Sequence, residues 1–176
     1  MDAISPPRGL IVDLVTPLTS DGALDLESLD RLIDLLVPHV HGVLAAGPAA
    51  GEGSYLDRKI RTELIARALR TIGGRVPLFA WVTDKDPEKT FSFIETVDRT
   101  VTGTPAGALF WVDTPLYYHS NRGLYDHYRE MSENLNRPMI LHNGPDFISE
   151  LKNPLKRNNI RTSLMKELVQ VETIAG

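Results

Sequence analysis

Short runs of apolar residues alternate with longer amphipathic segments along this chain, and that alternation limits the folds it can adopt. Each short run has the length of a buried strand and lacks the in-and-out pattern of a strand with one wet face; the runs are residues 10–15, 43–46, 78–82, 108–112 and 139–141. Between them, apolar side chains recur on one face of a 3.6-residue period in residues 26–37, 60–72 and 124–135. Doubly buried strands that alternate with helices predict a parallel α/β sheet.

Capping and turn-forming residues mark the ends of the predicted helices. Asp25 and Asp86 stand where helix N-caps are expected, and Gly73 follows the second helix. Toward the C-terminus the pattern predicts a loop, a short helix and the start of a sixth strand, in residues 147–159, 161–169 and 171–175.

Two architectures are compatible with this alternation. A doubly wound open sheet suits a chain of 176 residues, whereas a (β/α)8 barrel typically needs about 250. No Gly-x-Gly-x-x-Gly or Walker-type loop follows the first run, which argues against the nucleotide-binding forms of the open sheet. On the pattern alone, length favours the open sheet. We expect one domain, residues 1–176, without a separate linker.

The composition excludes several classes of function. A net charge of −4 offers no basic patch for a nucleic acid, and the lack of cysteine excludes disulfides and thiolate metal sites. No apolar run approaches the roughly 20 residues that span a bilayer. Residues 1–8 lack the basic-then-apolar layout of a signal peptide, so we expect a cytoplasmic protein.

Five segments, taken together, resemble one enzyme family. In chain order they are residues 13–22, 42–56, 74–78, 114–128 and 137–145. They include Thr16-Pro17, Gly51-Glu52 and the run from Leu141 to Pro145, and the specificity lies in all five segments being in register. In order and spacing, over nearly the whole chain, they resemble the dihydrodipicolinate synthase and N-acetylneuraminate lyase family of pyruvate-dependent class I aldolases.

The resemblance implies a (β/α)8 TIM barrel, of which this chain supplies about five strand–helix units and the start of a sixth strand. It also implies a class I aldolase-type enzyme, a carbon–carbon or carbon–oxygen lyase, that acts on pyruvate or a related 2-keto acid through a lysine Schiff base. The family's lysine is expected just beyond Gly176, so we expect the chain alone to be inactive. Further implications are no metal and no organic cofactor, no nucleic-acid or membrane partner, and a homodimer or homotetramer.

Two residues are the candidate proton movers that the resemblance implies. His142 matches the family's acid–base tyrosine at the end of the fifth strand, and an imidazole with a pKa near about 6.5 can give and take a proton. Tyr117 matches the tyrosine that reaches into a neighbouring subunit's site, with Tyr118 as the fallback. We expect His142 and Tyr117 to be catalytic; the alternatives are a histidine that only hydrogen-bonds in a turn and tyrosines that pack at a rim.

Ala49 and Ala50 stand where the family carries two threonines. The resemblance implies that backbone N–H groups of Ala49, Ala50 and Gly51 bind the substrate carboxylate, while the hydroxyl of the proton relay is lost. The alternative is an ordinary glycine- and alanine-rich turn.

Three further features leave the activity open. Asp146 and Phe147 occupy the region where dihydrodipicolinate synthases carry an arginine, which favours another keto-acid lyase or dehydratase over dihydrodipicolinate synthesis itself. A truncated, catalytically silent assembly or binding module is an alternative. A metal-dependent aldolase that uses His39, His41 or His142 is another, although two histidines without a nearby carboxylate are a weak zinc signal.

The six lysines of the chain fall in predicted helices and loops rather than at the end of a strand; they are Lys59, Lys85, Lys89, Lys152, Lys156 and Lys166. Exposed lysine amines with a pKa near about 10.4 are protonated at neutral pH and attack carbonyls poorly. We therefore predict that borohydride reduction with pyruvate leaves no stoichiometric adduct on this chain, as measured by mass spectrometry. A family aldolase with its own lysine is the positive control, and an adduct on any one of the six lysines would contradict the alignment.

Overall fold

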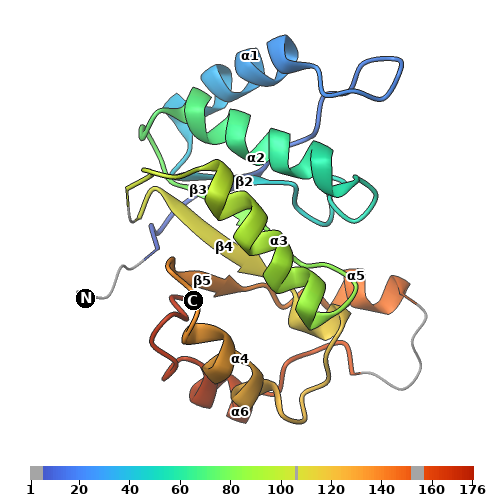
Figure 1. The fold of residues 1–176 in the computed structure, drawn as a ribbon, viewed down its shortest axis with the longest axis vertical. Coiled ribbons are helices and arrows are strands. Elements are labelled where there is room, and N and C mark those ends of the chain that lie inside the picture. Colours follow the sequence, from blue (N-terminus) through green and yellow to red (C-terminus); the bar gives the residue numbers. More distant parts are fainter. Residues whose placement is uncertain (1–5, 106, 152–156) are drawn as a thin grey trace.

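Five parallel strands form one sheet, and their spatial order is their order in the sequence. The computed structural model describes residues 6–105, 107–151 and 157–176. The strands are β1 (Ile11–Asp13), β2 (Gly42–Ala45), β3 (Leu78–Trp81), β4 (Leu109–Asp113) and β5 (Met139–Leu141), and each pairs with the next (Figure 1). A doubly wound sheet reverses direction at its switch point, whereas a barrel adds strands in one direction only. The open sheet that length favours is therefore wrong, and the partial (β/α)8 barrel is confirmed.

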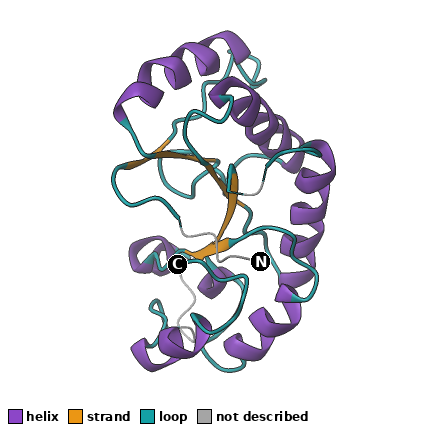
Figure 2. Ribbon diagram, turned by 90° about the vertical axis from the view of Figure 1, so that its left-hand side faces the viewer, coloured by secondary structure: helices purple, strands orange, loops and turns teal. Residues whose placement is uncertain are grey.

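The helices form an arc around the outer side of the strands (Figure 2). They are α1 (Leu26–Leu36), α2 (Arg58–Ile72), α3 (Pro87–Thr100), α4 (Leu124–Ser132), α5 (Pro145–Glu150) and α6 (Thr162–Leu168), with short 3₁₀ turns η1 (Val37–His39) and η2 (Pro115–Tyr117). None of the helices in the described residues combines the length and the apolar character needed to cross a bilayer.

The first three helices begin at aspartate caps, two of them where the sequence predicts. The side chains of Asp25, Asp57 and Asp86 accept hydrogen bonds from backbone N–H groups three residues further on, at 3.0, 2.8 and 2.8 Å. A carboxylate satisfies amides that the helix leaves unpaired, and such a cap stabilises a helix by about 0.5–2 kcal/mol. Gly73 ends α2 in the left-handed conformation that a helix C-terminus favours.

The predicted sixth strand starts beside β5. Met139 and Ile174 form a parallel bridge, and the N–H of Leu141 donates to the carbonyl of Gly176 at 2.8 Å. The loop predicted for residues 147–159 is wrong in its first part, because α5 begins at Pro145 and buries Ile148 against the core. Residues 152–156 of that prediction lie outside the described residues.

The sheet has two buried faces with different contents. Side chains alternate along each strand, so residues two apart share a face. The outer face joins the helices in the main core, while the inner face carries a separate cluster of Phe79, Trp81, Phe110 and Val112. The rings of Phe79 and Phe110 stack with centroids 5.1 Å apart. Large aromatic side chains therefore fill the inside of the barrel wall.

A buried carboxylate ties β4 to its neighbours on the outer face. Asp113 is fully buried, and its Oδ1 accepts a hydrogen bond from the Thr83 hydroxyl at 2.5 Å. Its Oδ2 accepts from the phenols of Tyr118 and Tyr128, each at 2.6 Å. Burial, and after it the charge of Asp113, raises the pKa of both tyrosines, which keeps them protonated as donors. This group fixes β3, the turn after η2 and the start of α4 to one another.

Replacing this carboxylate should destabilise the fold. Asp113→Asn loses the charge that three hydroxyls solvate, and we expect a loss of about 2–4 kcal/mol in the free energy of unfolding measured with urea. Tyr128→Phe removes one of the three donors and should cost about 1–2 kcal/mol. The control is Asp126→Asn, an exposed carboxylate on α4, which should change stability by less than about 0.5 kcal/mol. Equal stability of the Asp113 and Asp126 variants would contradict this role.

Candidate active site at the carboxyl ends of the strands

The strand register directs four polar or aromatic side chains toward the inside of the barrel wall at one end. Trp81 lies two residues after Phe79, and Thr114 lies two residues after Val112, so both continue the inner face. His142 follows Ile140 in the same way, and Asp13 pairs in register with Leu44, another neighbour of the inner cluster. Catalytic groups of (β/α)8 barrels lie at this carboxyl end of the strands.

His142 is held by a hydrogen-bond chain from two neighbouring strands. The indole N–H of Trp81 donates to Thr114 Oγ1 at 2.9 Å, and Thr114 Oγ1 lies 2.9 Å from His142 Nδ1. Because the indole can only donate, the Thr114 hydroxyl can give its own proton to Nδ1. That arrangement leaves the ring proton on Nε2. The backbone N–H of His142 donates to the carbonyl of Asp113 at 2.7 Å, which fixes the base of the side chain.

Gly144 gives the imidazole its space. A Cβ on Gly144 would lie 2.5 Å from His142 Cε1, closer than real atoms approach. Glycine is therefore needed at position 144 for the His142 ring to pack as it does.

Asp13 and His142 form an electrostatic pair at the inner face. Burial lowers the pKa of His142 below its ordinary value, and the charge of Asp13 opposes that shift. Burial likewise raises the pKa of Asp13, opposed by hydrogen bonds from the Ala50 and Gly51 amides and by His142. Each group stabilises the charged form of the other in a partly dehydrated place.

The loop after β2 closes tightly over Asp13. The N–H of Ala50 donates to Asp13 Oδ2 at 3.0 Å. A Cβ on Gly47 would lie 2.1 Å from Asp13 Oδ1, so the carboxylate is pressed against the loop backbone. Ala46 and Glu52 adopt positive φ angles of 55° and 53°, a conformation that non-glycine residues seldom adopt. The loop backbone is therefore held in a specific conformation around the Asp13 carboxylate.

The tyrosines after β4 point to different places. Tyr117 is half-buried, and its ring stacks on Phe147 with centroids 5.6 Å apart. Both rings meet Trp81 edge-on, at 6.4 and 6.0 Å. Tyr118 instead donates to Asp113 behind the sheet. Tyr117, and not Tyr118, thus joins the group around Trp81 and Thr114.

A buried cation borders this aromatic group. Arg61 of α2 is 4% exposed, donates to the carbonyl of Trp81 at 2.8 Å, and lies over the rings of Trp81 and Phe93 at 4.8 and 4.3 Å. Burial lowers its pKa to about 10, so it stays charged at neutral pH. Contact with two ring faces stabilises this buried guanidinium.

Sequence reasoning places His142, Tyr117 and the 49–51 loop near one another, and the structure brings Asp13, Trp81 and Thr114 to the same place. These three were missed. A signal was present for Asp13, because a charged residue that ends an otherwise apolar strand is unusual. Nothing in the sequence linked Trp81 to Thr114, since their contact depends on the pairing of β3 with β4.

The other histidines lie elsewhere. His39 and His41 precede β2, at the amino end of the sheet, while His142 follows β5 at the carboxyl end. Within the part of the chain that the structure describes, no group of three or more histidine or carboxylate side chains is arranged to hold a metal ion.

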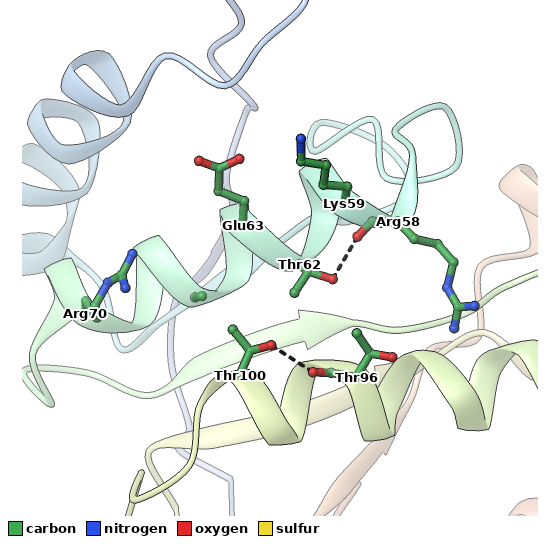
Figure 3. Close-up of a pocket in the computed structure, with 8 residues that line it drawn as sticks. Arg58, Lys59, Thr62, Glu63, Arg70, Thr96 and Thr100 are labelled. Atoms are coloured by element: carbon green, nitrogen blue, oxygen red, sulfur yellow. Dashed lines mark hydrogen bonds between the residues drawn. The ribbon is translucent and has the colours of Figure 1, made fainter.

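A hollow of about 580 Å³ lies away from this site, on the outer surface between α2 and α3 (Figure 3). Thr62 and Thr100 line it, but their hydroxyls donate to carbonyls of their own helices. Its charged lining side chains, Arg58, Lys59, Glu63 and Arg70, come from the outer helix α2 and not from the inner face of the sheet. The candidate site remains the inner face, where polar groups converge.

Comparison with known proteins gives the site its context. A family model described as the dihydrodipicolinate synthetase family matches residues 6–176. The 4-hydroxy-tetrahydrodipicolinate synthase of Thiobacillus denitrificans is 36% identical over 148 residues, which cover 82% of this chain and 48% of that protein. The chain thus spans about half the length of the curated relatives it matches.

Solved structures agree in fold. Dihydrodipicolinate synthase from Agrobacterium tumefaciens matches with a TM-score of 0.77 at 21% identity, covering 95% of this chain and 52% of that one. The Acinetobacter baumannii enzyme, solved with pyruvate, matches with a TM-score of 0.76 at 24% identity, covering 95% of this chain and 53% of that one. At these identities the likeness establishes the barrel architecture. With the family match over nearly its whole length, the chain belongs to the dihydrodipicolinate synthetase family.

Proposed function

We propose that the barrel to which this chain contributes is a class I aldolase-type lyase that acts on pyruvate or a related 2-keto acid through a lysine imine. The observation that carries the proposal is the position of His142 beside the start of the sixth strand. The Leu141 N–H pairs with the Gly176 carbonyl, so residues that continue this pairing run alongside His142. A lysine supplied there, just beyond Gly176, would form its imine within reach of the imidazole.

His142 is the proposed acid–base group. Its depressed pKa keeps the imidazole neutral near pH 7, with the Nε2 proton available for donation and Nδ1 able to accept a proton by way of the Thr114 hydroxyl, which also orients the ring. Tyr117 is the proposed second proton carrier, in a homodimer or homotetramer. Amides of the 49–51 loop are the proposed contacts of the substrate carboxylate.

We further propose that the reaction is not dihydrodipicolinate synthesis itself, although the curated relatives carry the name of that synthase. Phe147 stands where the resemblance places an arginine, and its ring stacks on Tyr117. An apolar ring there offers no partner for the carboxylate of a second substrate. Another keto-acid lyase or dehydratase fits this surface better.

One set of observations favours the catalytically silent alternative. Ala49 and Ala50 bring no hydroxyl to the loop, and the inner face is filled by Trp81, Phe147 and Tyr117. If the whole protein forms no trapped imine with pyruvate and shows no turnover, this alternative is favoured over the lyase.

Removing the imidazole should separate imine formation from turnover. In the whole protein with its sixth strand, His142→Ala should still give a borohydride-trapped pyruvate adduct, while turnover falls by about 10²-fold or more, the usual cost of losing a general acid–base group. The control is His39→Ala, an exposed position at the opposite end of the sheet, which should keep full turnover. Near wild-type turnover of the His142 variant would assign proton transfer to another group.

The pKa of His142 should respond to Asp13. In an NMR titration the ring should titrate below about 6.5, and Asp13→Asn should lower that pKa further, because a negative charge favours the imidazolium. Since the folded pKa is depressed, the contribution of His142 to stability is present above about pH 6.5 and is lost as the pH falls through the folded pKa. The control Asp146→Asn, an exposed carboxylate at the start of α5, should leave the pKa unchanged. A higher pKa of His142 in the Asp13→Asn variant would contradict the electrostatic pairing of Asp13 with His142.

A further inference from the structure

The loop after β2 already binds a carboxylate, and that carboxylate belongs to the chain. The Ala50 N–H donates to Asp13 Oδ2 at 3.0 Å, and the Gly51 amide also favours the charged form of Asp13. Gly47 lets the loop backbone come close to the other carboxylate oxygen, because a Cβ on Gly47 would lie 2.1 Å from Asp13 Oδ1. The loop backbone is thus shaped around an anion that β1 delivers.

The second oxygen of this carboxylate, Oδ1, is buried but not hydrogen-bonded by the described residues. A buried acceptor without a partner is costly, so the chain holds this carboxylate in the loop at a cost in stability. On the inner face, the charge of Asp13 acts on His142.

We propose that Asp13 is a specificity-determining residue, an internal ligand that occupies the loop amides and must be displaced before a substrate carboxylate can use them. The proposal rests on the proposed function, because it concerns the same loop and the same class of substrate. Two carboxylates cannot share the Ala50 N–H without repulsion, and Oδ1, which is pressed against Gly47, brings lone pairs and no donor. The loop amides are therefore open to the carboxylate of a 2-keto acid only when the Asp13 side chain turns away, and small carboxylates bind the wild type more weakly than a chain without this side chain.

The test follows the loop amides directly, by N-15 NMR of the full chain titrated with pyruvate and separately with acetate. Asp13→Ala vacates the amides, whereas Asp13→Asn keeps an oxygen acceptor without the charge. We expect the Ala50 and Gly51 resonances of the alanine variant to move on addition of either anion, with an affinity at least about 10-fold higher than that of the wild type. The asparagine variant should lie between the two. The control is Asp21→Asn, an exposed turn carboxylate that bonds Thr19, and it should bind as the wild type does.

The outcomes separate this inference from the proposed lyase activity. Binding by the alanine variant that is no tighter than that of the wild type overturns the inference, as does an Ala50 resonance that both Asp13 substitutions leave unchanged in the absence of ligand. Acetate reports on the loop without any imine chemistry. If the alanine variant binds acetate more tightly while the whole protein forms no trapped imine, the inference stands and the lyase proposal fails.

Discussion

The parallel pairing of β1 to β5 in sequential order is the constraint on which the rest of this structure depends. It sets the curvature that places the helices on one side only, and it sorts every strand residue to an inner or an outer face. The outer face merges with the helices into the main core. The inner face carries its own aromatic cluster, so the two layers are filled independently.

The contrast between Asp13 and Asp113 shows what this sorting does. Both aspartates end an apolar strand, and the local sequences of the two strands are alike in pattern. Register turns Asp113 outward, where three hydroxyls solvate it and make it an anchor of the fold. The same register turns Asp13 inward, where none of the described residues is a hydrogen-bond partner for one of its oxygens and the carboxylate lies within the electrostatic reach of His142. Asp113 therefore has a structural role, whereas Asp13 is part of the candidate site.

The candidate site differs in character from a polar, hydroxyl-rich pocket. Its proposed proton-moving group is an imidazole positioned by Thr114, its loop amides hold an internal carboxylate, and its wall is aromatic. Removal of water by these rings strengthens the mutual effect of Asp13 and His142, because charges interact more strongly where the effective dielectric constant is low. The aromatic wall thus contributes to the chemistry of the site as well as to its packing.

The sequence by itself determined the alternation of strands and helices, the aspartate caps at Asp25 and Asp86, and the family, because these are local patterns or motifs in a fixed order. It also located His142 and the 49–51 loop, since each directly follows a strand. On length alone it favoured the wrong architecture. It also missed α5, because that short helix is marked only by Pro145 at its start and by the single buried contact of Ile148. Only the tertiary structure decided that Asp13, Trp81 and Thr114 belong with His142, and that Tyr117 and Tyr118 point to different sides. Those relations depend on which strands pair and in what register, and pairing between segments 28 or more residues apart leaves no trace in the local pattern of either segment.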